Sequence, residues 1–450
     1  MLNLPGHITS LLKTFKDAGF EIYVVGGTVR GLIMQADVTD WDFATSATPD
    51  EIMKLFPHSF YNNSYGTAGI PSEVDGKSYV YEVTTFRKES GYSNTRHPDE
   101  VTWAQTVEED LARRDFTINA MAYDGTTYID PYHGQADIEK KLIRAVGDPD
   151  VRFAEDALRL IRAVRQAAQL GFTIDGPTHE SIKKNAASIT NISGERIRDE
   201  FFKLLRAPYS ADGILMLRET ELLKYILPEV DTCFGVDQKS PERHHIYDVG
   251  THLVESLCHC PSEDVITRFA TLIHDIGKKE TYRKDPKTQI ITFYNHEVVG
   301  EKQAEQIADR FKLSHDQKTK LLTLVRGHQF TVSEDQSDKA VRRFIRQIGL
   351  ENIDDMLALR TGDRLGSGAK ESSWRTELFK KRIVDVQHVP FSVHDLKITG
   401  HDVMEVVGIK PGRQIGDIMD QIFEEVDDEK IVNEREVLLE RLREIKKTLE

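Results

Sequence analysis

The 450-residue sequence predicts an α+β fold: a small mixed sheet with helices near the N-terminus, followed by helical domains. Two observations carry this prediction. Before about residue 130, short apolar segments are separated by glycines and polar residues, which is typical of strands and turns. From residue 151 onward, apolar residues recur at helical spacing, and a block from about 240 to 365 carries eight of the 16 histidines.

The first part of the chain predicts the elements of the sheet. Residues 1–15 indicate a short amphipathic helix. Residues 22–25, 42–44 and 78–86 are β-like, the last with clear alternation. The polar, Gly/Ser/Asn-rich stretch 87–98 predicts a mobile loop between strands, and ARRDFTINAMAYDG at 112–125 a helix followed by a strand.

The remaining chain predicts helices. Residues 152–172 indicate one helix that ends at Gly171, and Ser193 is the expected N-cap of the next. The last 85 residues read as helical, with a break at 410–416.

Composition narrows the class of protein. Hydrophobic residues are 39% and charged residues 30%, an ordinary globular mixture. No apolar run approaches the ~18–20 residues of a membrane helix, and the N-terminus has no secretory pattern. Three cysteines, Cys233, Cys258 and Cys260, fit structural thiols in a reducing cytoplasm, with a metal site as the alternative.

The charge distribution indicates where a nucleic acid would bind. A net charge of −15 argues against a protein that coats nucleic acid nonspecifically. Residues 139–206 carry 13 Lys/Arg against 10 Asp/Glu, and residues 424–450 carry 6 against 10. The first region is therefore the better partner for phosphates.

Two aspartates close behind a double glycine are the first candidate site. Side chains two apart on a strand face the same side, so Asp40 and Asp42 would project together and need a cation, most naturally Mg²⁺. The turn at Gly26 and Gly27 lets backbone N–H groups approach a polyphosphate, and Arg30 can pair with it. Together these residues predict a nucleoside-triphosphate site.

A charged helix face is the second candidate. Asp156, Arg159, Arg162 and Arg165 recur every three residues, so Asp156 and Arg159 place an acceptor and a forked donor side by side. That pair matches the hydrogen-bonding edge of a base. Taken alone, the stretch reads equally well as a solvated helix face.

The double-glycine stretch and six further motifs in register resemble those of the class II tRNA nucleotidyltransferases, the family of bacterial CCA-adding enzymes and poly(A) polymerases. The resemblance covers roughly the first 230 residues continuously. The stretches that carry it are GGTVRG with DWDFAT at 26–45, YEVTTFRKE at 81–89, NTRHPDEV at 94–101, EEDLARRDFTINAMAY at 108–123, DPYHGQADIEKKLIRAVGDP at 130–149, RFAEDALRLIRAVRQAAQLGF at 152–172 and ISGERIRDEFFKLL at 192–205.

The resemblance implies roles for individual residues. Asp40 and Asp42 would hold two Mg²⁺ ions, with Glu82 as a candidate third carboxylate, and Asp156 with Arg159 would pair with the incoming C or A. By the same resemblance, Asp156 and Arg159 would act as a protein template for the base, and the stretch 87–98 would correspond to the loop thought to reorient that template. Further nucleotide-binding residues would be Arg113, Arg114, Asp115 and Asn119 for ribose and phosphates, and Arg162 and Arg165 toward the triphosphate or primer. One departure is Gly31, where the family motif usually has Asp.

The histidine block resembles the HD metal-dependent phosphohydrolase domain. A His-Asp doublet followed by Ile-Gly-Lys lies within helical sequence, with a histidine before it and an aspartate after it. The resemblance implies a second divalent metal site, although a structural relic stays open. Its ligands would be His252, His274, Asp275 and Asp363, with His296 and His328 completing a two-metal site.

The resulting prediction is a polymerase-β-type nucleotidyltransferase head at 1–130, a helical neck at 131–240, an HD domain at 241–365 and a helical tail at 366–450. The expected activity is addition of the 3′-terminal CCA, or part of it, to a tRNA acceptor arm from CTP and ATP in the cytoplasm, without a membrane. A-only or CC-only addition, poly(A) synthesis and an HD-type phosphohydrolase acting on nucleotide or RNA ends are the alternatives. The oligomeric state stays open.

Overall fold

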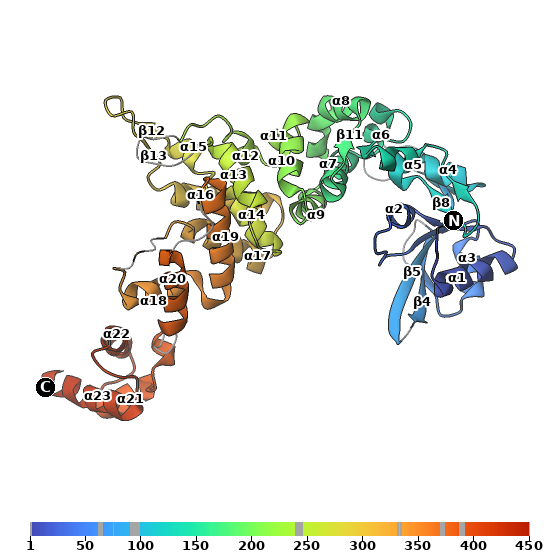
Figure 1. Ribbon diagram of the computed structural model, residues 1–450. Helices are drawn as coiled ribbons and strands as arrows, with labels where there is room; N and C mark the ends of the chain where they lie inside the picture. The colour runs from blue at the N-terminus through green and yellow to red at the C-terminus, as the bar shows by residue number, and fades with distance from the viewer. Residues whose placement is uncertain are drawn as a thin grey trace. The chain divides into compact units, whose positions relative to one another are not determined.

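The computed structural model shows two compact units, which are described separately (Figure 1). The first unit comprises Met1–Thr232 with Ile307–Lys312, and the second Cys233–Gln306 with Leu313–Glu450. The predicted division into four domains remains a prediction. The structure describes residues 2–61, 66–74, 76–90, 100–238, 246–330, 333, 335–369, 374–386 and 392–449.

A mixed seven-stranded sheet forms the N-terminal part of the first unit, as predicted. The strand order is β3-β4-β5-β2-β1-β8-β9, and β2 and β5 pair in parallel whereas the other neighbours are antiparallel. β4 and β5 are its longest strands, and they run side by side in Figure 1. The strands are β1 (Ile22–Val25), β2 (Asp42–Thr45), β3 (Phe60–Tyr61), β4 (Thr67–Val74), β5 (Lys77–Thr85), β8 (Ala122–Tyr123) and β9 (Tyr128–Ile129).

Short helices pack around this sheet. The predicted N-terminal helix is α1, which buries Ile8, Leu11, Leu12 and Phe15, the spacing of an amphipathic helix. A buried cluster that includes Val25, Phe86 and Leu111 joins β1 to the chain around α4. The helices of this part are α1 (Gly6–Asp17), α2 (Gly27–Ile33), α3 (Pro49–Leu55), α4 (Val107–Ala112) and α5 (Gly134–Glu139).

Two predictions for this part were wrong in detail. The start of the expected loop at 87–98 is a strand, because β6 (Arg87–Ser90) pairs with β7 (Glu100–Trp103); residues 91–98 lie outside the described part of the chain. The expected strand after Asp115 is mostly a 3-10 turn at Thr117–Asn119, followed only by the short β8.

The helix predicted at 152–172 is interrupted. α6 (Pro149–Glu155) ends where Asp156 adopts an extended backbone with φ −145° and ψ 108°, and α7 (Leu158–Leu170) begins two residues later. The predicted end at Gly171 is confirmed, since Gly171 is a left-handed cap with φ 65°. Asp156 therefore does not share a helix with the arginines of α7.

The rest of the first unit is helical, except that β10 (Leu142–Ile143) and β11 (Thr173–Ile174) form a short parallel ladder. Ser193 lies at the predicted N-cap of α9, but its side chain makes no capping hydrogen bond. The helices are α8 (Gly176–Asn185), α9 (Gly194–Leu205), α10 (Ser210–Glu219), α11 (Leu223–Ile226) and α12 (Pro228–Asp231).

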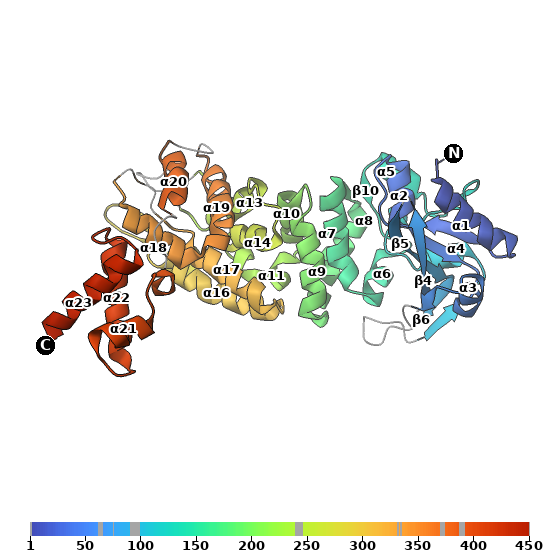
Figure 2. The same ribbon diagram turned by 90° about the horizontal axis from the view of Figure 1, so that it is seen from below.

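The second unit is helical apart from the two-stranded ladder of β12 (Arg283–Lys284) and β13 (Ile291–Thr292). α13, α14, α17 and α19 pack on one another, and α21–α23 gather around an apolar cluster that contains Val403, Ile422 and Leu442 (Figure 2). The helices are α13 (Val249–Cys258), α14 (Val265–Ile273), α15 (Lys278–Thr281), α16 (His296–Arg310), α17 (His315–Gly327), α18 (Asp338–Ile348), α19 (Ile353–Gly366), α20 (Trp374–Asp385), α21 (Gly400–Val407), α22 (Arg413–Asp427) and α23 (Arg435–Leu449).

Two features bear on the environment of the protein. Across the described ranges, no helix combines the length and apolar character needed to cross a membrane. None of the three cysteines forms a disulfide, and burial raises the pKa of the Cys233 thiol to about 12, as expected of an unreactive structural thiol.

Candidate functional sites

A cavity of about 470 Å³ in the first unit gathers the predicted nucleotide-binding residues. Seven arginines and three aspartates line it, so its wall is strongly cationic. Of the residues predicted for this site, Asp40 and the candidate third carboxylate Glu82 do not line it. The predicted residues in the wall are Gly26, Gly27, Arg30, Asp42, Arg113, Arg114, Asp115, Asn119, Asp156, Arg159, Arg162 and Arg165; Leu158, Gln166 and Arg196 also contribute.

The first glycine of the pair is required by its backbone geometry. Gly26 has φ 68°, and a Cβ atom there would lie 2.9 Å from Arg114 Nη1. Only glycine adopts this conformation without strain, and only glycine lets that arginine lie against the turn. At Gly31, where the family motif usually has Asp, a Cβ would lie 3.1 Å from Val38 Cγ2, so a side chain would require Val38 to shift.

A hydrogen-bonded chain orients the arginine behind this turn. Arg30 Nη1 donates to Asn119 Oδ1, and Asn119 Nδ2 donates to Asp115 Oδ1 at 3.1 Å and to Gln166 Oε1 at 3.0 Å. Burial lowers the pKa of Arg30, whereas Asp115 raises it. Arg30 is thus a desolvated cation held in place by neutral and acidic partners, which suits it to bind an anion.

The two metal-binding candidates differ from the expected arrangement. β2 begins at Asp42, so Asp40 precedes the strand, and the reasoning that both share a strand face was wrong. Thr28 fixes the connection: its Oγ1 donates to Asp40 O at 2.9 Å and accepts from Asp42 N at 3.2 Å. Desolvation raises the pKa of Asp42, Arg114 lowers it, and Glu82 and Asp40 raise it further. Acids whose negative charge raises the pKa of a neighbouring carboxylate form a charge arrangement that a cation would relieve.

Asp156 and Arg159 both line the cavity, but each has another partner. Asp156 Oδ1 accepts from Leu158 N at 3.0 Å, and Oδ2 accepts from Arg196 Nη2 at 2.9 Å. Arg159 Nη1 donates to Glu155 Oε2 at 2.5 Å and to Arg152 O at 3.0 Å. Both groups are therefore held in place: Asp156 by Leu158 and Arg196, which also line the cavity, and Arg159 by Glu155 and Arg152, which do not.

Buried acids hold the remaining arginines. Arg162 binds Asp115 Oδ2 through Nε at 2.9 Å and Nη2 at 2.5 Å, and Arg165 Nε binds Glu200 Oε2 at 2.5 Å. Burial alone would raise the pKa of Asp115, but Arg162 lowers it on balance. Within the described part of the chain, two guanidinium nitrogens at this cavity, Arg114 Nε and Arg196 Nη1, are buried without an acceptor. The cavity fits a polyanion better than a neutral ligand.

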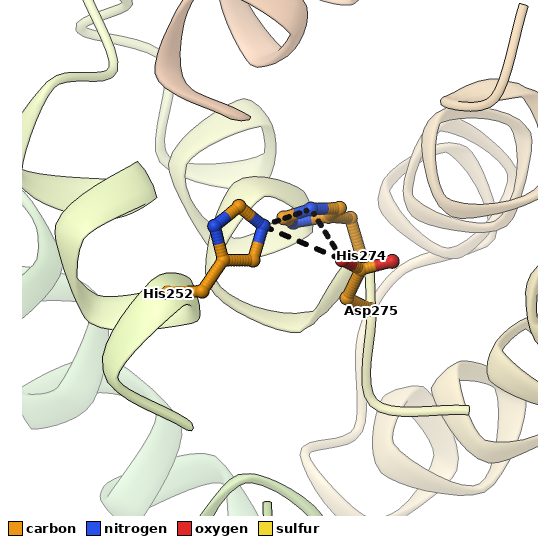
Figure 3. Close-up of side chains that lie close together, drawn as sticks. All are labelled: His252, His274 and Asp275. Atoms are coloured by element: carbon orange, nitrogen blue, oxygen red, sulfur yellow. Dashed lines mark hydrogen bonds and ion pairs between the residues drawn. The ribbon is translucent and has the colours of Figure 1, made fainter. Parts of the chain in front are cut away.

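The second unit brings together all six residues of the predicted HD set, of which Figure 3 shows His252, His274 and Asp275. Asp275 lies at the centre: its Oδ2 is 3.3 Å from Nε2 of both His252 and His274, and its Oδ1 is 3.2 Å from His296 Nε2. His328 Nε2 lies 3.4 Å from the same Oδ1. Asp363 Oδ1 completes the first side, 3.4 Å from His252 Nε2.

The outer ring nitrogens fix how these imidazoles present themselves. Nδ1 of His274, His296 and His328 lies 2.8, 2.8 and 2.7 Å from a backbone carbonyl oxygen. A proton on Nδ1 leaves the Nε2 lone pair facing inward, the tautomer of a metal-binding histidine. The facing Nε2 atoms lie only 3.3 Å apart in His252–His274 and 3.2 Å in His296–His328. Nitrogen and oxygen donors in this arrangement fit divalent metal ions.

Two groups of possible ligands share Asp275. One is His252, His274 and Asp275, and the other is Asp275, His296 and His328. Neither contains a cysteine, so the alternative metal role for Cys258 and Cys260 gains no support from the described residues. A cavity of about 380 Å³ opens onto this centre, and Lys278, Tyr294 and Arg360 are among its lining residues. Lys278 Nζ lies 2.5 Å from Asp275 Oδ2.

Sequence reasoning missed several residues of the first site. Arg196 and Glu200 lie four residues apart on α9, hence on one face, and both contact the cavity arginines or Asp156. The sequence feature that could have indicated them is the position of two charged residues on the side of an amphipathic helix that faces the core. Arg152, Glu155 and Asp110 support the wall from behind.

Three family models match the chain in succession. The Poly A polymerase head domain matches residues 22–144, and the probable RNA and SrmB-binding site of polymerase A matches residues 171–234. A putative tRNA nucleotidyltransferase domain 2 matches residues 285–442, across the predicted boundary between HD domain and tail.

Similar proteins agree with these matches. A CCA-adding enzyme of Pediococcus pentosaceus is 32% identical over 440 residues, 97% of each chain. One from Geobacillus sp. (strain WCH70) is 45% identical over 218 residues, 48% of this chain and only 53% of that protein. The crystal structure of a Bacillus stearothermophilus CCA-adding enzyme in complex with CTP has a TM-score of 0.72 and 27% identity, covering 98% of this chain and 97% of that one.

Proposed function

Because the chain belongs to the family of CCA-adding enzymes, we propose that it adds the 3′-terminal CCA, or part of it, to tRNA from CTP and ATP. The observation that carries this proposal is the cationic cavity, in which the double glycine, Asp42 and the base-reading candidates Asp156 and Arg159 line one space. Poly(A) synthesis is the less favoured activity, because the full-length relatives add CCA and the C-terminal segment is acidic.

Two groups of arginines in the cavity would bind the triphosphate. Arg30 and Arg114 lie beside the double glycine, where the backbone can approach phosphate oxygens. Arg162 and Arg165, oriented by Asp115 and Glu200, continue the cationic wall. Fixed guanidinium groups lose little freedom on binding, so they place the α-phosphate for in-line attack by the tRNA 3′-hydroxyl.

Class II nucleotidyltransferases depend on divalent metal ions, and we assign Mg²⁺ to Asp40 and Asp42. Bound Mg²⁺ supplies activation of the 3′-hydroxyl and charge stabilisation for the leaving pyrophosphate. The chain's contribution is two aspartates whose backbone is tied together by Thr28, with Asp42 in the cavity wall and close to Glu82.

Asp156 and Arg159 would choose the base. Cytosine and adenine both carry an exocyclic amino group, whereas uracil and guanine carry a carbonyl oxygen at the corresponding position. A fixed carboxylate accepts from the former and repels the latter. Fixed charges of this kind can select C and A without a nucleic-acid template.

A tRNA that lacks its 3′ end tests the proposal. Wild-type protein should incorporate labelled CTP, and Asp42→Asn should reduce incorporation by at least 10³-fold because one metal-binding carboxylate is lost. Undiminished incorporation by Asp42→Asn would refute the assigned chemistry. Arg283→Gln, in the exposed β12 of the other unit, is the control.

A second activity is favoured by the convergence of four imidazoles on Asp275. We propose that this centre binds divalent metal and hydrolyses phosphate esters at nucleotide or RNA ends. Bound metal would supply an activated water, and Arg360 and Lys278 line the cavity where a phosphate would enter.

We place the protein in the cytoplasm, because Cys258 is exposed without a disulfide.

A further inference from the structure

We propose that Arg196 is a positioning residue for base choice, which holds the Asp156 carboxylate in the orientation that separates C and A from U and G. This inference rests on the proposed nucleotidyltransferase function. It concerns a residue of α9, 40 positions after Asp156, that neither the sequence motifs nor the comparisons assign.

The first support is the way Asp156 is held. Its backbone is extended between α6 and α7, so no helix fixes its side chain. Instead each carboxylate oxygen has one contact: Oδ1 accepts from Leu158 N at 3.0 Å, and Oδ2 accepts from Arg196 Nη2 at 2.9 Å. Two points fix the plane of a carboxylate, whereas the Leu158 contact alone would leave it free to turn.

The second support is that the Arg196 guanidinium is committed to this contact. In the described part of the protein, Nη2 binds Asp156, whereas Nη1 is buried and has no acceptor. A buried guanidinium nitrogen without a partner costs free energy, so a simple structural tie would be expected to satisfy it. Arg196 also lines the nucleotide cavity itself.

The third support is the contrast with the other cavity arginines. Arg159, Arg162 and Arg165 are held by Glu155, Asp115 and Glu200, acids that keep them in the wall. In the Arg196–Asp156 pair we infer the opposite arrangement, in which the arginine positions the carboxylate that contacts the base. Reading an amino group requires an acceptor whose orientation is set before the base arrives.

The physical consequence is specific to the choice of base. A carboxylate that can turn loses alignment with the amino groups of C and A, and it also loses its repulsion of the carbonyl oxygens of U and G. Removal of Arg196 should therefore lower the ratio of correct to incorrect incorporation, and not simply the rate. Misplacement of a reading group by about 1 Å can cost on the order of 100-fold.

The test measures kcat/KM for CTP and UTP on a tRNA that lacks CCA, and for ATP and GTP on a tRNA that ends in CC. Arg196→Met keeps the bulk of the side chain and removes the donors. We expect the CTP/UTP and ATP/GTP ratios to fall by about 10- to 100-fold. Arg196→Lys keeps a single cationic donor, so its CTP/UTP and ATP/GTP ratios should lie between those of wild type and Arg196→Met. Arg198→Ala, on the same helix and bonded to Asp199 and Lys312 O, should keep both ratios.

A double-mutant cycle shows whether Arg196 acts through Asp156. If it does, Asp156→Asn with Arg196→Met discriminates no worse than Asp156→Asn alone. An equal loss of kcat/KM for all four nucleotides, or unchanged ratios, would overturn the inference. If Arg196→Met does not fold, Arg196→Lys decides: a ratio at least threefold below wild type supports the inference, and an unchanged ratio overturns it. A wild type that incorporates neither CTP nor ATP would instead refute the proposed function, and this inference with it.

Discussion

Asp42 on β2 lies directly opposite Glu82 on β5 in the register of the two parallel strands. Side chains that pair in this way project from the same face of the sheet, and Glu82 raises the pKa of Asp42. Two neighbouring acids with no cation between them repel, so their pairing at the edge of a phosphate-binding cavity favours a shared divalent ion. The register thus supports Glu82 as the third carboxylate.

Replacement of Glu82 tests this assignment. Glu82→Gln should reduce nucleotide incorporation by about 10- to 1000-fold, less than Asp42→Asn, since Glu82 lies outside the cavity wall. Raising the Mg²⁺ concentration should restore part of the activity, which steady-state kinetics at several Mg²⁺ concentrations would show. Glu73→Gln, on β4 and opposite Ser78, is the control and should behave as wild type. An unchanged Mg²⁺ dependence in Glu82→Gln would remove Glu82 from the metal site.

Gly26 offers a second test, of the phosphate-binding turn. Gly26→Ala places a Cβ 2.9 Å from Arg114 Nη1 at φ 68°, so it should displace that arginine and reduce kcat/KM by about 10- to 100-fold. Gly147→Ala has a similar φ of 71° but nothing within 4 Å of the added Cβ. It should cost about 1–2 kcal/mol of unfolding free energy with little loss of activity. Equal activity of the two variants would argue against a role for the turn in phosphate binding.

The histidine centre makes a prediction about metal content. His274→Ala should lose bound transition metal in elemental analysis, because Nε2 of this buried imidazole faces both aspartates. Chelation should lower the melting temperature of the wild type but not of His274→Ala, since metal stabilises only a protein that binds it. Nucleotide incorporation should be retained in this variant. His259→Ala, half exposed beside Glu255, serves as the control. Wild-type protein without metal after growth in metal-supplemented medium would favour the structural relic.

Acid stability should depend on the contact between Lys16 and Asp124. Burial alone would raise the pKa of Asp124, but Lys16 and the backbone of Thr126 and Thr127 lower it to about 2. Because the folded pKa lies below the unfolded value of 3.8, the contribution is present above pH 4 and is lost as the pH falls through about 2. Asp124→Asn should therefore cost up to about 1 kcal/mol at pH 7 and much less near pH 2, where the folded carboxyl is about half protonated, as measured by urea unfolding at each pH. A pH-independent difference would contradict this origin.

From the sequence, the residues that line the first cavity were predicted more accurately than the backbone conformation around them. Gly26, Arg30 and Asp42 lie within short local motifs, and such motifs fix their own turns and strands. The break at Asp156 could not be predicted, because Glu155, Asp156 and Ala157 are all compatible with a helix. Contacts distant in sequence stabilise the break, notably that of Asp156 with Arg196.

The histidine centre differs from the first cavity, because its residues do not belong to one local motif. His252 lies on α13, His274 directly after α14 and Asp363 on α19, so only tertiary packing brings them together. The resemblance to the HD phosphohydrolase domain was enough to group these residues from the sequence, whereas their role as metal ligands stays a prediction. Their backbone carbonyl partners, such as Thr271 O for His274, carry no sequence signal and needed the structure.

Incorporation on three tRNAs that end before the CCA, after the first C and after CC tests the central claim most directly, with labelled CTP and ATP supplied separately. We expect CTP to be used on the first two ends and ATP only on the third, with one adenylate added. Repeated ATP addition on all three ends, or no incorporation of either nucleotide, would contradict this claim.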